Sequence, residues 1–281
     1  MDMKSKKNLF GICEWSLPCG PFAGVRGIHM AADIGFDGIQ LGDMGGAEKG
    51  FPMSTDESLR AEYRETAEER GVLFQSLHLY TLLREGTMIY PRNSTQGESA
   101  MVSLRAGILA CRKLGIPELS LTSGFQCEIK EENGFRNFAA MLNYACDEAE
   151  EYGIKIGFES ILSVPEIKRM REETRGRIGV CYDTYNMLRF QKGDPVQDIE
   201  QLSLEDIDHF HLKDAPENNV GCALLGTGRG NFSKVAEAIR SKGYRGWLIT
   251  ENYYGQEPLC AQGNPEQLAR VDLETMKRYF D

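Results

Sequence analysis

The sequence predicts an α/β fold, a single (β/α)₈ TIM barrel covering residues 1–281 as one domain. Three observations support it: strand and helix patterns alternate along the chain, about eight such units occur, and no segment resembles an interdomain linker. Strands joined by crossover helices run parallel and are covered on both faces, and eight of them favour a closed barrel. A doubly wound sheet is the alternative, but the first strand is not followed by G-x-G-x-x-G.

Each expected strand is a short apolar run that stops at polar or turn residues. The runs cover residues 8–13, 38–41, 72–78, 118–122, 154–158, 177–182, 207–212 and 246–250. Helix patterns cover residues 25–34, 54–70, 98–114, 133–152, a segment from 163, pieces up to 202, 232–242 and 264–279. Capping boxes at Ser54/Glu57 and Ser163/Glu166 begin two of these helices. Residues 42–50 are expected to form a Gly-rich loop and residues 80–97 a long polar loop.

Composition excludes several classes of protein. The chain has 281 residues, 41% of them hydrophobic and 26% charged, so it can bury a large core. Its formal net charge of −10 disfavours nucleic acid, since proteins that follow phosphate backbones usually carry a basic face. No apolar run approaches the roughly 20 residues that span a bilayer, and residues 1–8 lack the apolar segment of a signal peptide. Eight scattered cysteines without a C-x-x-C pair indicate reduced thiols and a cytoplasmic protein.

The stretch from Asp208 to Asp214 (DHFHLKD) combines a buried-strand pattern with charged side chains. Because a strand alternates faces, His209, His211 and Lys213 are expected on one side and Phe210 on the other. In an isolated strand, such histidines are more often core residues that bond backbone carbonyls. Side chains at the neighbouring strand ends favour a functional site instead.

Four side chains occupy the ends of the fifth to eighth expected strands: Glu159, Asp183, His211 and Glu251. Strand ends and the loops after them carry the reactive groups of such barrels, so these side chains are expected to meet. Three converging carboxylates would repel one another unless a cation neutralises them. Three carboxylates and one imidazole suit one divalent cation, Mn²⁺ first, with Mg²⁺, Co²⁺ or Zn²⁺ as alternatives. Singly, each carboxylate would more often cap a helix or form a salt bridge; four in register favour a metal site.

Four short motifs around these residues carry a family resemblance: Phe158-Glu159-Ser160, Cys181-Tyr182-Asp183-Thr184, His211-Leu212-Lys213-Asp214 and Thr250-Glu251-Asn252. They resemble the metal-ligand motifs of the xylose-isomerase-like sugar phosphate isomerase/epimerase family, which includes ketose 3-epimerases, hydroxypyruvate isomerase and inosose dehydratase. The resemblance implies a barrel that holds one divalent cation through Glu159, Asp183, His211 and Glu251. It also implies that Glu159 and Glu251 move protons on opposite faces of the substrate.

The expected activity is metal-dependent isomerisation or epimerisation of a small sugar, sugar phosphate or polyol. A metal that bridges a carbonyl and the neighbouring hydroxyl stabilises an enediolate, and a carboxylate then removes the proton next to the carbonyl. A dehydratase acting on an inosose or keto-sugar uses the same metal and enolate and is the main alternative. A sugar-binding barrel without turnover is a second one. The family's endonuclease IV branch needs more histidines than the four present here.

Further candidates for substrate binding surround the expected ligands. Trp15 could form an apolar wall against a sugar and His78 could bond a hydroxyl, with core packing as the alternative for both. Lys213 could reach substrate oxygens, although an ion pair with Asp214 is the expected role. The remaining candidates are Glu14, Asn186 (where the epimerases usually have His) and Arg229, with Glu166 as the nearest match to a further acidic residue. Gly226–Gly230 looks like part of a phosphate loop but is more typical of a flexible loop. The protein could form a homodimer or a homotetramer.

Overall fold

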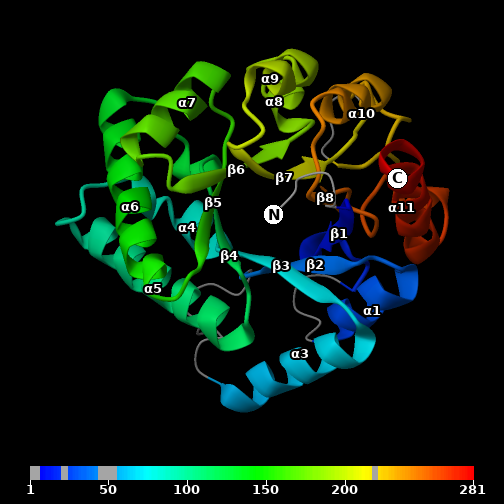
Figure 1. The fold of residues 1–281 in the computed structure, drawn as a ribbon, viewed down its shortest axis with the longest axis horizontal. Coiled ribbons are helices and arrows are strands. Elements are labelled where there is room, and N and C mark those ends of the chain that lie inside the picture. Colours follow the sequence, from blue (N-terminus) through cyan, green and yellow to red (C-terminus); the bar gives the residue numbers. More distant parts are fainter. Residues whose placement is uncertain (1–6, 20–24, 44–55, 217–220) are drawn as a thin grey trace. The chain divides into compact units, whose positions relative to one another are not determined.

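The computed structural model describes residues 7–19, 25–43, 56–216 and 221–281. Eight strands form one closed barrel in chain order, with parallel pairing, which confirms the predicted α/β TIM barrel (Figure 1). The strands are β1 (Leu9–Cys13), β2 (Gly38–Gly42), β3 (Leu73–His78), β4 (Glu118–Thr122), β5 (Lys155–Glu159), β6 (Ile178–Asp183), β7 (Ile207–Leu212) and β8 (Trp247–Thr250). The helices are α1 (Arg26–Ile34), α3 (Glu57–Arg70), α4 (Tyr80–Glu85), α5 (Thr95–Leu114), α6 (Glu132–Glu150), α7 (Val164–Glu173), α8 (Asn186–Arg189), α9 (Pro195–Gln201), α10 (Phe232–Ser241) and α11 (Pro265–Phe280).

The residues group by their contacts into two compact units. One comprises Met1–Gln40, Thr66–Leu73 and Tyr182–Asp281, and it contains β1, β7, β8, α1 and α8 to α11. The other comprises Leu41–Glu65 and Phe74–Cys181, and it contains β4, β5 and α4 to α7. Strands β2, β3 and β6 and helix α3 contribute residues to both. The expected single domain over the whole chain therefore stays a prediction.

The alternation predicted for the seventh strand is confirmed. Phe210 packs edge-on against the ring of Tyr244, with centroids 4.9 Å apart, on one side of β7. On the other side, the rings of His209 and His211 lie 5.3 Å apart, and both side chains are fully buried. One face of β7 therefore packs against the core, and the two imidazoles lie on the opposite face.

Local capping explains where several helices begin. Ser163 and Glu166 form the predicted capping box of α7, and Asn264 Oδ1 accepts the N–H groups of Glu266 and Gln267 at the start of α11. Each cap satisfies backbone donors that have no partner within the helix. Ser54, the first residue of the other expected capping box, lies outside the described residues, as do residues 44–50 of the expected Gly-rich loop.

The expected polar loop over residues 80–97 is wrong in its first part. Helix α4 occupies Tyr80–Glu85 and ends where Gly86 adopts a left-handed φ of 67°. Leu82 and Leu83 are buried, and this burial of a short apolar segment outweighs the loop-like composition of its surroundings. A 3₁₀ turn at Thr87–Ile89 follows before α5 begins.

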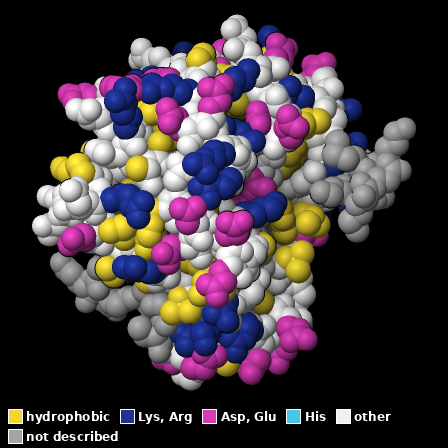
Figure 2. Space-filling view, turned by 60° about the vertical axis from the view of Figure 1, so that its left-hand side comes forward, with side chains coloured by type: hydrophobic (Ala, Val, Ile, Leu, Met, Phe, Trp, Pro, Cys, Tyr) yellow, Lys and Arg dark blue, Asp and Glu magenta, His cyan; other side chains and the backbone are white. Residues whose placement is uncertain are grey.

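The face drawn in Figure 2 carries Lys and Arg side chains interspersed with Asp and Glu, with small separate hydrophobic areas. Ion pairs of this kind join Glu132 of α6 to Arg136 and Arg169 at 2.8 and 2.5 Å. Exposed pairs contribute little to stability, so such a surface affects solubility more than the fold. Among the described residues, no helix has the length and apolar character needed to cross a membrane.

Candidate active site

Strand register brings the predicted ligand residues to neighbouring strand ends. In the β5–β6 ladder Glu159 pairs with Cys181, and Asp183 lies two residues further along β6 on the same face. In the β7–β8 ladder His211 pairs with Ile249, and the N–H of Glu251 donates to Leu212 O at 3.0 Å. The four side chains therefore end four consecutive strands, as the sequence predicted.

Asp183 has one carboxylate oxygen tied to the backbone and one turned toward other side chains. Its Oδ1 accepts the N–H groups of Tyr185 and Asn186, both at 2.7 Å, where the chain turns into α8. Its Oδ2 lies 2.7 Å from Lys213 Nζ. The backbone bonds fix the orientation of the carboxylate, so that Oδ2 is the oxygen presented for ion binding.

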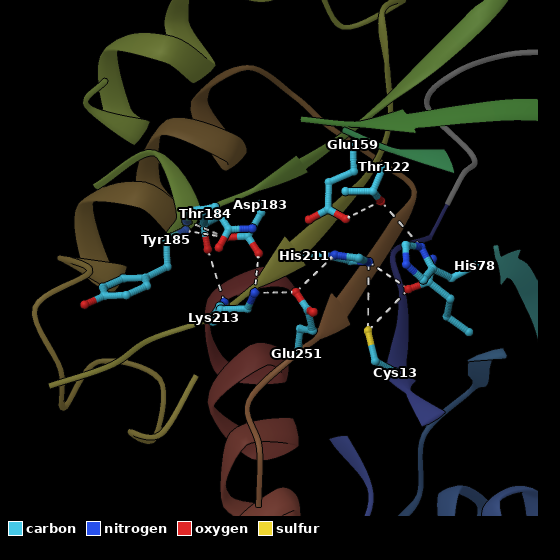
Figure 3. A network of polar contacts seen from close by, with 12 residues as sticks. Cys13, His78, Thr122, Glu159, Asp183, Thr184, Tyr185, His211, Lys213 and Glu251 are labelled. Atoms are coloured by element: carbon cyan, nitrogen blue, oxygen red, sulfur yellow. Dashed lines mark hydrogen bonds and ion pairs between the residues drawn. The ribbon is translucent and has the colours of Figure 1, made fainter. Parts of the chain in front are cut away.

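The two carboxylate oxygens of Glu251 also have different partners. Its Oε1 accepts the indole N–H of Trp15 at 3.0 Å. Its Oε2 lies 2.6 Å from Lys213 Nζ and 3.3 Å from His211 Nδ1 (Figure 3). Burial by itself would raise the pKa of Glu251, but the Lys213 ammonium and the bond to His211 outweigh burial and hold that pKa well below its ordinary value of 4.5. Glu251 is therefore an anion at neutral pH.

His211 is oriented by a residue from the second strand. Gln40 Oε1 lies 2.8 Å from His211 Nε2, and Cys13 Sγ also bonds Gln40 Oε1 at 3.3 Å. Since an amide oxygen can only accept, Nε2 donates to Gln40, and Nδ1 is the nitrogen that faces Glu251. An imidazole fixed in this way by a partner on its second nitrogen is typical of metal-binding histidines.

Glu159 accepts a hydrogen bond from Thr122, whose hydroxyl also contacts His78. Thr122 Oγ1, at the end of β4, donates to Glu159 Oε2 at 3.1 Å. His78 Nδ1, at the end of β3, lies 3.5 Å from the same hydroxyl (Figure 3). His78 thus belongs to a hydrogen-bonded line that ends on a predicted ligand, and its side chain is buried.

The other candidate residues for substrate binding differ in their exposure and in their contacts. Glu14 is buried in the 3₁₀ turn Glu14–Ser16 after β1. The N–H of Asn186 helps to fix Asp183, and Arg229 has an exposed side chain. Glu166, the candidate further acid, accepts the N–H and O–H of Ser163 in the capping box.

The expected ion pair between Lys213 and Asp214 is wrong, because the two side chains, which follow the end of β7, bond different partners. Lys213 bonds Asp183 and Glu251 instead. Asp214 accepts four backbone N–H groups, from Ala215, Gly226, Gly228 and Gly230, at 2.8 to 3.0 Å. The glycine segment expected to be flexible is thus an ordered loop wrapped around a carboxylate.

A second buried network supports the strand end that carries Glu251. Asp272 of α11 accepts hydrogen bonds from Asn252 Nδ2 and Tyr254 Oη, both at 2.8 Å. Tyr254 Oη is also 2.7 Å from Thr250 Oγ1. Both neighbours of Glu251 in the chain are therefore anchored to one aspartate of the last helix.

The titration of Asp272 should be visible in the pH dependence of the free energy of unfolding. Burial raises its pKa from 3.8 to about 7, although the bonds from Asn252, the N–H of Leu225 and Tyr254 act in the opposite direction. Because the folded protein binds this proton more tightly than the unfolded chain, the contribution of Asp272 to stability is present below pH 4 and lost as pH rises toward 7. The loss is on the order of 4 kcal/mol.

The measurement is urea unfolding between pH 4 and 8 for the wild type and Asp272→Asn. The free energy of unfolding of the wild type should fall relative to that of the variant up to about pH 7 and then run parallel to it. Glu274→Gln, an exposed change on the same helix, is the control and should keep the wild-type slope. A parallel pair of curves across the whole range would show that Asp272 does not titrate there.

Within the unit that contains β7 and β8, three of the predicted ligand residues lie close together: Glu251 Oε2 is 3.3 Å from His211 Nδ1, and Lys213 Nζ lies 2.7 Å from Asp183 Oδ2 and 2.6 Å from Glu251 Oε2. Two carboxylates and one imidazole are a donor set that divalent cations accept. When ionised, the two carboxylates carry two negative charges; Lys213 balances one of them, and a divalent cation would balance both. The donor chemistry therefore fits a divalent cation.

Sequence reasoning missed the partners that hold these groups. The sequence patterns predict Gln40 and Thr122 only as strand residues, and they predict Trp15 against a sugar face and not at Glu251. A signal existed for Gln40, because a glutamine inside an otherwise apolar strand (GIQLG) is costly to bury without a partner. Nothing local identifies its partner, which is 171 residues away.

Comparison with known proteins defines the class. Residues 28–279 match the family model of the xylose isomerase-like TIM barrel, and the chain belongs to this family. It is 30% identical over 272 residues to 2-epi-5-epi-valiolone 7-phosphate 2-epimerase of Actinoplanes sp., covering 95% of this chain and 93% of that protein. The chain is thus an enzyme of the sugar isomerase and epimerase class.

Solved structures agree with the barrel fold. D-psicose 3-epimerase of Clostridium cellulolyticum H10, solved with D-tagatose, has a TM-score of 0.79 at 14% identity, covering 97% of this chain and 99% of that one. The IOLI protein, solved with a zinc atom, has a TM-score of 0.72 at 13% identity over 97% and 98% of the two chains. At these identities the likeness shows the fold alone.

Proposed function

We propose that the protein is a divalent-metal-dependent isomerase or epimerase that moves a proton at the carbon next to the carbonyl of a small sugar, sugar phosphate or polyol-derived ketone. One observation carries this proposal: Asp183, His211 and Glu251 lie together within one unit, with Glu251 Oε2 3.3 Å from His211 Nδ1 and Lys213 Nζ 2.6 to 2.7 Å from both carboxylates. The phosphorylated substrate of the Actinoplanes relative and the ketoses of the structural neighbours support this range of substrates.

The four residues are the proposed ligands, and Mn²⁺ is the proposed cation, with Mg²⁺, Co²⁺ and Zn²⁺ as alternatives. Three oxygen donors favour the harder ions. The zinc atom of the IOLI protein supports a divalent cation without selecting Mn²⁺. When bound, the cation would supply positive charge that stabilises the negative charge of an enediolate.

Glu159 and Glu251 are the proposed proton carriers. Each has one oxygen held by a neutral donor, Thr122 in one case and Trp15 in the other, which fixes the direction of the carboxylate. Since Glu251 is held as an anion, it can accept a proton from the carbon without first losing one. Glu159 would return a proton from the other face of the substrate.

The substrate's hydroxyl groups need polar partners around these carboxylates. The proposed contacts are Glu14, Trp15, His78, Asn186, Lys213 and Arg229. The exposed guanidinium of Arg229 suits a phosphate or carboxylate on the substrate. Asn186 can bond a hydroxyl through its amide but cannot carry charge.

A reducing compartment such as the cytoplasm is the proposed location. All eight cysteines are free thiols, and burial raises the pKa of Cys13 to about 12, which keeps that thiol protonated beside His211. A homodimer or homotetramer remains a prediction.

The proposal is tested by following solvent deuterium into substrate carbon. The protein, treated with chelator and then given Mn²⁺, is mixed in deuterated water with ketoses and their phosphates, including valiolone-type cyclitol ketones, and followed by NMR. We expect exchange next to the carbonyl only with the cation present, together with an epimer or isomer as product. Exchange that proceeds equally in excess chelator would contradict the metal requirement, and a dehydrated product would assign the enzyme to the lyases.

A further inference from the structure

Lys213 bonds the two carboxylate oxygens that the proposed cation needs. Its Nζ lies 2.7 Å from Asp183 Oδ2 and 2.6 Å from Glu251 Oε2, and its side chain is 3% exposed (Figure 3). Its backbone N–H donates to Thr184 Oγ1 at 3.2 Å, which holds the start of the side chain in place. The ammonium is thus a buried ion pair partner of both acids.

The other oxygen of each acid is already used. Asp183 Oδ1 accepts two backbone N–H groups, and Glu251 Oε1 accepts the indole N–H of Trp15. Oδ2 and Oε2 are the oxygens turned away from these donors, and they are the atoms that Lys213 bonds. An ammonium and a metal ion cannot both take the same short contacts, since each would lie within about 3 Å of the same oxygens and repel the other.

We propose that Lys213 is an internal counter-ion that competes with the divalent cation for Asp183 and Glu251. In the metal-free enzyme its ammonium neutralises the two buried carboxylates. When the cation binds, the ammonium leaves Oδ2 and Oε2. This inference rests on the proposed metal site and assigns to Lys213 a role in controlling metal affinity.

The test uses Lys213→Met, which keeps the length of the side chain and removes the charge. Titration calorimetry with Mn²⁺ should show tighter binding than in the wild type, by about tenfold or more, because the competing cation is gone. In chelator the same variant should unfold at a lower urea concentration than the wild type, because two buried carboxylates lose their counter-ion. Stability and metal affinity thus change in opposite directions.

The matched control is Lys234→Met, which removes one positive charge from an exposed position on α10 and should change neither quantity. Should Lys213→Met fold too poorly to purify, Lys213→Gln is measured in the same way. Mn²⁺ affinity that is equal or weaker in the Lys213 variants, with normal binding by the wild type, overturns the counter-ion role alone. A wild-type protein that binds none of Mn²⁺, Mg²⁺, Co²⁺ and Zn²⁺ overturns the proposed metal site as well.

Discussion

Replacing Glu251 with glutamine is expected to lower the rate of deuterium exchange into the substrate by about 10²–10⁴-fold, the usual contribution of a positioned general base. Glutamine keeps the shape of the side chain and an oxygen that can accept from the indole N–H of Trp15. It removes the negative charge that would accept the proton and bind the cation. Exchange is measured by NMR at saturating Mn²⁺, with the metal content of the purified variant determined alongside.

Two controls separate proton transfer from metal loss and from general damage. Glu200→Gln, an exposed change at the end of α9, should leave exchange at the wild-type rate. Trp15→Phe removes the indole N–H that holds Glu251 Oε1 and should slow exchange by a smaller factor, about tenfold, the effect of losing one hydrogen bond to a charged group. Should Glu251→Gln bind Mn²⁺ and exchange protons at the wild-type rate, another group must carry the proton.

Asp214→Ala is expected to lower the free energy of unfolding by about 3–5 kcal/mol. The carboxylate accepts four backbone N–H groups and is fully buried, so alanine leaves those donors without their acceptor. The exposed Gly226 can turn to water, which is why the expected cost is smaller than four separate losses. The quantity is measured by urea unfolding at neutral pH.

Asp214→Asn is the matched variant for this prediction. The asparagine amide has one oxygen that can accept, and its N–H₂ group faces backbone N–H donors that it cannot bond. The free energy of unfolding of this variant should therefore lie between those of the wild type and the alanine variant. Glycine is needed where the loop meets Asp214, because a Cβ at Gly228 would collide with Asp214 Oδ1. Gly228→Ala should therefore reproduce part of the loss. An alanine variant at 214 within 1 kcal/mol of the wild type would show that the loop does not depend on this carboxylate.

The order of the strand and helix units and the residues at the strand ends follow from local sequence patterns. The alternation around Phe210 and His211 and the capping box at Ser163 are local patterns, set by strand period and by backbone donors that need a nearby acceptor. The same reasoning identified Glu159, Asp183, His211 and Glu251 as residues at neighbouring strand ends, because parallel strands of one barrel end at the same rim. The prediction of a loop is wrong at residues 80–85, where the burial of Leu82 and Leu83 stabilises a helix.

The partner of each of these side chains depends on the folded barrel. Lys213 bonds Asp183 and Glu251 and not its neighbour Asp214, Trp15 reaches Glu251 across 236 residues, and Gln40 holds Nε2 of His211. Each pairing depends on strand register and on the direction of a side chain, and neither follows from the residues adjacent in sequence. The sequence therefore predicts which acids and imidazoles lie at the ends of the strands. The folded barrel determines which carboxylate oxygen faces a cation and which cation binds that oxygen.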